Sequence, residues 1–278
     1  MIELTYRFAI SKDARFVTPM GMTTPHVSVL GFDIEGARVS GVAAPNCAQM
    51  LAFGVPEASE IALRVQFAPE GPGYPEQMFH PTDSRYTRSA AALAGETRSI
   101  AEAAGGGAAG LQAIVNHVAG LFEYGHPEER FYDGQDELPQ LCSLAQGSCV
   151  DINAYLIAAL RAAGYEAGYI YGVFVPEEKQ TWAEDGHCWV VTRHYGVCQE
   201  WDIAHFLKMG MRDIRPGLNP KPGVRLPMAH SMGWTVPALG IRDFKLMGLP
   251  LLLTEDGVLD FPDMTLSLTG YQDLAAQT

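Results

Sequence analysis

The stretch "QGSCVDINAYLIAALRAAGYEAGYIYGVF", residues 146–174, passes from a polar loop into an apolar helical pattern and then into a strand-like run. Apolar side chains recur at helical spacing over its middle part and predict one buried face. That face comprises Ile152, Tyr155, Leu156, Ala159, Leu160 and Ala163. Gly164 follows as a residue type that commonly ends helices. The stretch therefore predicts a core helix followed by a strand.

The helix is predicted to begin at Cys149. Ser148 is a favoured N-cap residue, and Asp151 three positions later completes the pattern of a capping box. A thiol at the first helical position lies at the positive end of the helix dipole, which lowers its pKa and favours the thiolate. Taken alone, Cys149 is better interpreted as a small buried apolar residue, because most cysteines are inert, so a second group is needed for a catalytic interpretation.

A second stretch, "DGHCWVVTRHYGVCQEWDI" at 185–203, has the pattern of a β-hairpin. A turn near its "HY" pair sets His187 directly opposite Asp202, and directly opposed residues have Cβ atoms about 5 Å apart. The alternation of the strand places Cys188 on the other face, where we interpret it as structural. His187 and Asp202 are therefore expected within hydrogen-bonding reach of each other.

A thiol, an imidazole and an orienting carboxylate make a nucleophilic triad, here Cys149, His187 and Asp202. Gln146 is the candidate side-chain donor of an oxyanion hole, beside the Cys149 backbone N–H. The opposing interpretation is a cross-strand His–Asp pair without catalytic meaning. Two further histidines, His205 and His230, could each line a cleft, but we interpret them as satisfied surface or interface residues.

Composition narrows the class of partner. The chain has 278 residues, of which 47% are hydrophobic and 18% charged, and its formal net charge is −13. This acidic balance argues against nucleic acid and anionic membranes as partners. We find no secretory signal and no membrane span, and the five scattered cysteines suit a reduced, cytoplasmic chain. There is no C-x-x-C pair of the kind that binds zinc, so no metal is expected. No other cofactor is expected either.

The flanking regions differ in pattern. Alternating runs over the first 70 residues predict an antiparallel β sandwich, and a turn-rich segment follows. The domains are expected at 1–75 (β domain), 76–109 (linker and helix) and 110–278 (catalytic domain with an irregular, Pro-rich C-terminal extension). The segment 215–227 carries many prolines and is expected to lack regular structure. A hairpin is expected around Asp256-Gly257.

These motifs resemble the transglutaminase-like superfamily, in particular its bacterial branch of candidate cysteine proteases. The resemblance covers about 110–205 and rests on Gly-x-Cys-x-Asp, "RAAGYEAGYIYG", a His-x-Trp-Val strand and a Trp-Asp pair. It implies an α+β, papain-like core with the nucleophile helix packed on an antiparallel sheet, preceded by an all-β sandwich-like domain. It also implies Cys149, His187 and Asp202 as the triad. The residue after His187 is Cys188 where the family often has Ala, and the usual "DPT" is "DIA" here.

The function implied is thiol-dependent acyl transfer on amide bonds of a peptide or protein, as a cysteine peptidase, an amidase or a transamidase. The alternative is a catalytically silent scaffold that keeps the fold and binds a partner. A third, weaker option is a metal site that uses Cys149 and His187. The pattern leaves the acyl acceptor and the oligomeric state open.

Overall fold

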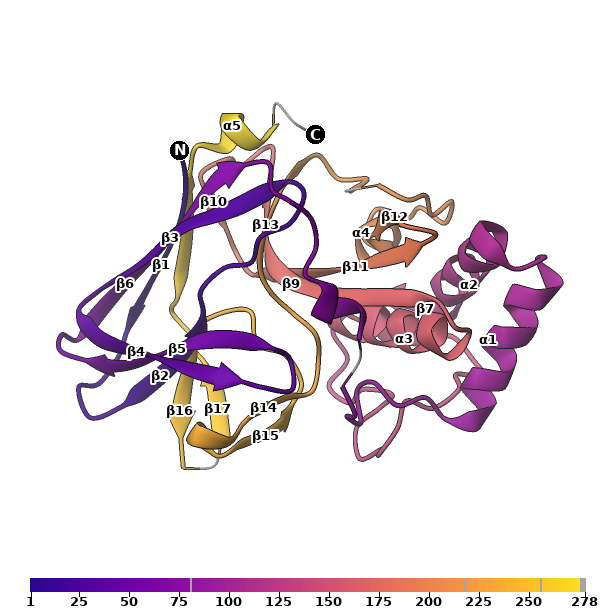
Figure 1. The fold of residues 1–278 in the computed structure, drawn as a ribbon, viewed down its shortest axis with the longest axis horizontal. Helices are drawn as coiled ribbons and strands as arrows, with labels where there is room; N and C mark the ends of the chain where they lie inside the picture. The colour runs from indigo at the N-terminus through magenta and orange to yellow at the C-terminus, as the bar shows by residue number, and fades with distance from the viewer. Residues whose placement is uncertain (81, 218, 256, 276–278) are drawn as a thin grey trace. The chain divides into compact units, whose positions relative to one another are not determined.

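The computed structural model describes residues 1–80, 82–217, 219–255 and 257–275 (Figure 1). They form two compact units. The β unit comprises Met1–Gln77, Tyr171–His187 and Pro222–Thr278, and the helical unit comprises Met78–Ile170 and Cys188–Lys221. Compact units need not coincide with domains, so the domain boundaries at 75 and 110 stay predictions. Among the described residues, no helix combines the length and apolarity that a membrane crossing requires.

The β unit contains two five-stranded sheets (Figure 1). The first has the order β10 (Trp182–Ala183), β18 (Thr265–Thr269), β1 (Ile2–Ala9), β6 (Glu60–Pro69) and β3 (Val27–Glu35). The second has the order β17 (Gly257–Asp260), β16 (Leu251–Thr254), β2 (Arg15–Pro19), β5 (Gln49–Pro56) and β4 (Ala37–Ala44). In each sheet a C-terminal strand pairs antiparallel with an N-terminal one, β18 with β1 and β16 with β2. Strands from both ends of the chain therefore complete the sandwich.

Period-two alternation explains the core of this sandwich. Ile2, Leu4 and Tyr6 are fully buried, as the alternation along the first strand predicts. Between the sheets, the ring of Phe8 on β1 meets Phe16 on β2 edge-on, with ring centroids 5.4 Å apart. Large buried side chains of this kind each contribute about 1.5–3 kcal/mol to stability. The β-sandwich expectation for the N-terminal region is confirmed.

The Pro-rich segment departs from its expectation. Residues Gly223–His230 form strand β13, with Pro227 inside it, so the prediction that 215–227 lacks regular structure is wrong for its last part. The strand is the last in the order β12-β11-β9-β13. A proline is tolerated there because an edge strand has ladder positions that need no N–H donor. The expected hairpin exists as β16 and β17, although its turn residue Asp256 lies outside the described residues.

Smaller elements complete the β unit. They are η1 (Glu76–Phe79, which continues into the helical unit), β14 (Trp234–Val236), η2 (Pro237–Leu239), β15 (Ile241–Phe244) and α5 (Tyr271–Ala275). Strand β14 pairs with β15, and Trp234 is fully buried in a cluster with side chains of β2 and β5.

The helical unit is built around one central helix. Its elements are α1 (Ala91–Ala103), α2 (Gly107–Leu121), β7 (Phe122–Tyr124), β8 (Ala145–Gly147), α3 (Cys149–Ala162), β9 (Glu166–Pro176), β11 (Gly186–His194), β12 (Val197–Trp201) and α4 (Ile203–Lys208). Strands β9 and β11 begin or end in the β unit, because the boundary falls inside them. The unit combines a short parallel pair, β7 with β8, and the antiparallel pair β11 with β12.

Helix α3 begins and ends where the sequence predicts. At its C-terminus, Gly164 has φ +88°, and its N–H bonds the Arg161 carbonyl while the Tyr165 N–H bonds the Leu160 carbonyl. This is the Schellman pattern, which needs a residue that tolerates positive φ. The prediction of a single buried face is too narrow, because every residue from Asp151 to Leu160 is buried. The helix is internal and meets neighbours on all sides.

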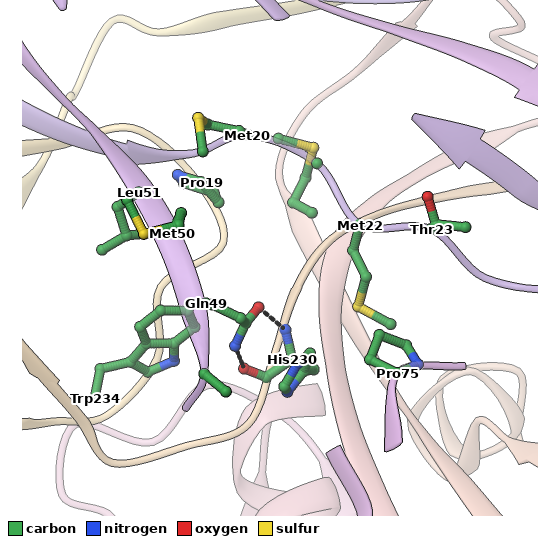
Figure 2. A pocket seen from close by; sticks show the side chains of 13 residues that line it. Pro19, Met20, Met22, Thr23, Gln49, Met50, Leu51, Pro75, His230 and Trp234 are labelled. Atoms are coloured by element: carbon green, nitrogen blue, oxygen red, sulfur yellow. Dashed lines mark hydrogen bonds between the residues drawn. The ribbon is translucent and has the colours of Figure 1, made fainter. Parts of the chain in front are cut away.

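A cavity of about 290 Å³ lies within the β unit (Figure 2). Methionines dominate its wall, namely Met20, Met22, Met50 and Met228. Gln49 and His230 are joined by two hydrogen bonds, from Gln49 Nε2 to the His230 carbonyl (2.8 Å) and from the His230 N–H to Gln49 Oε1 (3.0 Å). Burial lowers the pKa of His230 to about 4. His230 is 3% exposed, so its interpretation as a surface residue is wrong.

His230 makes the stability of the protein sensitive to acid. Between its ordinary pKa of about 6.5 and the folded value of about 4, the unfolded chain binds a proton that the folded chain does not. The unfolding free energy is therefore expected to fall as the pH drops through this window, by up to about 3 kcal/mol from this group. Urea denaturation of the wild type and His230→Gln at pH 7, 5.5 and 4.5 measures it. Parallel acid dependence in both proteins contradicts the assignment.

Candidate active site

Cys149 is the first residue of α3, as predicted, and its side chain is half-buried. The capping box is present. Asp151 Oδ2 accepts hydrogen bonds from the Ser148 backbone N–H (2.8 Å) and from Ser148 Oγ (2.7 Å). The Asp151 carboxylate thus serves the cap, as the sequence predicts, and fixes the backbone on which the Cys149 thiol is mounted.

The loop before α3 supplies partners for the Asp151 carboxylate that the sequence did not predict. Tyr132 donates its hydroxyl to Asp151 Oδ1 at 2.5 Å, and Arg130 Nε lies 3.4 Å from the same oxygen. Burial, followed by the Asp151 charge, raises the pKa of Tyr132, which therefore stays a donor. Asp151 is 1% exposed, so this buried charge needs all of these donors. The only sequence signal for them was the length of the polar loop.

Asn153 joins the helix to strand β11. It lies one helical turn beyond Cys149, on the same side of α3. Its Nδ2 donates to the backbone carbonyl of Cys188 at 2.9 Å and lies 3.6 Å from Cys188 Sγ. Asn153 is fully buried, and its hydrogen bond to Cys188 fixes the position of β11 along the first turns of α3. Asn153 was not among the predicted site residues.

Cys188 is in direct contact with the nucleophile candidate. Its buried thiol hydrogen-bonds Cys149, and burial together with that bond and the Cys149 charge raises its pKa well above the ordinary value. A hydrogen bond with Tyr169 and one with Asn153 act in the opposite direction. The interpretation of Cys188 as a purely structural residue is therefore incomplete, because its thiol is part of the site.

The β11–β12 hairpin keeps the predicted faces but not the predicted register. Val190 is opposite Trp201, and continuing this ladder brings Asp202 level with Trp189. The prediction that His187 lies directly opposite Asp202 is therefore wrong by two residues. The offset is even, so the paired residues of the hairpin keep their predicted faces, and Asp202 comes after the last paired residue, Trp201.

Asp202 leaves the strand and caps the next helix. It is the N-cap residue of α4, fully buried, and its Oδ1 accepts the His205 backbone N–H at 3.0 Å. Its Oδ2 lies 3.0 Å from His205 Nδ1 and accepts from Asn219 Nδ2 at 3.1 Å. The interpretation of His205 as a surface residue is wrong, since its side chain is buried against this carboxylate. An irregular segment after the motif supplied Asn219 without any sequence signal.

His187 lies at the start of β11 and is 6% exposed. Within the β unit its ring approaches Phe174 edge-on, with centroids 5.9 Å apart. Gln146 lies on β8 opposite Glu123, exposed, with its side chain folded over Gly125. A Cβ at Gly125 would come within 2.5 Å of Gln146 Cδ, so a larger residue there would require the Gln146 side chain to move. Its role as oxyanion donor stays a prediction.

Metal binding is a separate question from the triad. Asp202 and His205 are residue types that bind metal ions, but here the carboxylate bonds the imidazole and the Asn219 amide directly. The arrangement is that of a hydrogen-bonded carboxylate and imidazole. The expectations of no metal and no cofactor stay predictions.

Comparisons with known proteins agree with this architecture. Residues 93–202 match the family model of the transglutaminase-like superfamily. No curated protein matches the sequence.

Two solved structures are similar to this chain. A candidate cysteine protease from Cytophaga hutchinsonii is 11% identical, with 96% of this chain and 97% of that chain covered and a TM-score of 0.50. The periplasmic domain of TgpA from Pseudomonas aeruginosa is 14% identical, with 76% and 90% covered and a TM-score of 0.41. The first likeness spans both the β-rich part and the core, so the predicted α+β fold is confirmed. The chain thus carries a transglutaminase-like domain over residues 93–202.

Proposed function

We propose that the protein is a thiol-dependent acyl-transfer enzyme that acts on amide bonds of a peptide or protein. The observation that carries the proposal is the position of Cys149 at the first residue of a capped internal helix. The helix dipole stabilises a thiolate there by about 0.3–1 kcal/mol or more. The thiol is also half-buried, so a substrate carbonyl has access to it.

The second thiol supports the same assignment. Burial raises the pKa of the Cys188 thiol well above its ordinary value, so Cys188 favours its protonated form beside Cys149. An S–H donor beside a thiolate stabilises its charge. Cys188 is therefore a positioning donor to the nucleophile, in addition to filling space in the core.

His187 is the proposed acid–base and Asp202 the residue that orients it. His187 directly precedes Cys188 in the sequence, so their Cα atoms are about 3.8 Å apart. The Cys188 thiol in turn hydrogen-bonds Cys149. Asp202 directly follows Trp201, the last paired residue of β12, and we propose it as a diagonal neighbour of His187. Diagonal neighbours in a hairpin are within reach of side chains such as imidazole.

The proposed reaction has two halves. The Cys149 thiolate attacks the amide carbon, and imidazolium His187 protonates the departing amine as the C–N bond breaks. Helix N-terminal N–H groups, with Gln146, stabilise the oxyanion in between. Water or an amine then attacks the thioester, gives its proton to His187, and expels Cys149. Water gives hydrolysis, and an amine gives transamidation.

Cys149 is expected to be the most reactive thiol of the chain. Iodoacetamide at neutral pH should alkylate it faster than Cys142 and Cys198, although those two are more exposed. Mass spectrometry of the time course measures the order. Cys149→Ala should lower turnover of amide substrates by about 10⁴-fold with folding intact. Equal labelling of the three thiols would favour a silent scaffold instead.

His187 and His205 form a matched pair for assigning the base. His187→Ala should remove the reactivity of Cys149 below its free-thiol pKa of about 8.5, because the thiolate loses its imidazolium partner. His205→Ala removes an imidazole from the same carboxylate and should leave that low-pH reactivity in place. The pH profile of alkylation is the readout. Loss of the low-pH limb in His205→Ala alone assigns the base to His205.

Asn153 is a positioning residue, and its effect should separate from simple destabilisation. Asn153→Ala removes a buried hydrogen bond to the Cys188 carbonyl and should cost about 1–3 kcal/mol. Thr192→Val is the matched control, because it removes the buried bond from Trp201 Nε1 to Thr192 Oγ1 in the same hairpin. Both variants should lose stability, but only Asn153→Ala should slow alkylation of Cys149. Equal rates in the two would contradict this role.

A further inference from the structure

The five cysteines of the chain differ sharply in their surroundings. Cys142 and Cys198 are exposed, whereas Cys188 is fully buried and Cys149 is half-buried. Of these, Cys149 and Cys188 are hydrogen-bonded through their side chains. Asn153, one helical turn after Cys149, has its Nδ2 3.6 Å from Cys188 Sγ, which places the Cys188 sulfur beside the start of α3. The pair therefore joins one thiol that small solutes can reach to one that they cannot.

Rigid elements hold the two thiols together. Cys149 is on the first turn of α3, and Cys188 is the third residue of strand β11. The Asn153 side chain fixes the Cys188 carbonyl from within α3, one turn below Cys149. Tyr169, on β9, also bonds the Cys188 thiol. The contact thus arises from packed secondary structure, with Cys188 enclosed on its other sides.

We propose that Cys149 and Cys188 form an oxidative modification site, in which a peroxide oxidises Cys149 and Cys188 captures the product as a disulfide. The inference rests on the proposed function, because it needs Cys149 to be the reactive thiolate. Besides its role as a donor to Cys149, the Cys188 thiol is placed where it can reach a sulfenic acid formed on Cys149.

The chemistry balances with hydrogen peroxide as the oxidant. The Cys149 thiolate attacks one peroxide oxygen, the O–O bond breaks, and hydroxide leaves, which gives Cys149 sulfenic acid. The sulfur of Cys188 then attacks the sulfenic sulfur, and the sulfenic oxygen leaves as water with the Cys188 proton. Two electrons pass from the sulfur pair to the peroxide. Closing the bond brings the sulfurs from contact to about 2.0 Å, which side-chain rotation must supply.

The consequence is a reversible stop on catalysis. A disulfide occupies the nucleophile and prevents its further oxidation to sulfinic acid, which thiols do not reverse. Reduction by a dithiol returns both thiols. Without Cys188, the sulfenic acid has no neighbour to capture it at this position and proceeds along the irreversible branch.

The test uses the full chain, reduced and then treated with one molar equivalent of hydrogen peroxide. Free thiols are blocked, the protein is digested without reductant, and linked peptides are mapped by mass spectrometry. The expected result is a Cys149–Cys188 linked peptide, loss of iodoacetamide labelling at Cys149, and full recovery after dithiothreitol. Cys149 sulfinic acid with Cys188 recovered as a free thiol overturns the proposal, as does a disulfide from Cys149 to another cysteine.

Two variants sharpen the outcome. In Cys188→Ala treated with excess peroxide, a second peroxide should oxidise the Cys149 sulfenic acid to sulfinic acid, so the lost labelling should not return with dithiothreitol, whereas wild type under the same excess should recover. Cys142→Ser removes an exposed thiol and should still form the link. The alkylation rate of untreated protein is read separately. If Cys149 is no faster than Cys142 there, the proposed function fails, whereas rapid alkylation without a linked peptide defeats only the disulfide.

Discussion

The site depends on one buried carboxylate. Asp151 accepts two hydrogen bonds from Ser148 and one from Tyr132, and Arg130 lies beside it. A buried charge with fewer donors would cost several kcal/mol, so the cap, the loop tyrosine and the arginine are parts of a single arrangement. That arrangement fixes the direction of the first turn of α3. The position of the Cys149 thiol follows from it.

A second interaction fixes the first turns of α3 relative to strand β11. The Asn153 side chain reaches from the second turn of α3 to the Cys188 carbonyl on β11. The backbone that carries His187 is the next peptide along. Helix and strand are therefore tied to each other within one turn of Cys149, by an amide that carries no charge.

Local sequence signals predicted helix α3 well, whereas features that depend on pairing between separate segments were missed. Ser148, Asp151 and Gly164 act on neighbours within a few residues, so their pattern was sufficient. The hairpin register was missed because its turn is Tyr195-Gly196, with φ of +48° and +78° at the two positions. Such a turn favours Asn or Gly at both, and tyrosine there gives no sequence signal.

The C-terminal strands were missed for a related reason. The run "TLSLT" at β18 alternates cleanly, yet its partner β1 lies at the other end of the chain. Nothing local indicates a pairing over that separation. The same limit hid Tyr132, Asn219 and the contact of Cys188 with Cys149, since each depends on which face of one element meets another.

The thiol pair shows why face prediction and site prediction differ. Alternation along β11 correctly separated Cys188 from the His187 face, and that separation was taken to exclude Cys188 from the chemistry. The structure reverses the inference, because the face opposite His187 is the one that packs on α3. Placing cysteine there, where a small apolar residue would pack equally well, keeps Cys149 in contact with a buried thiol of raised pKa.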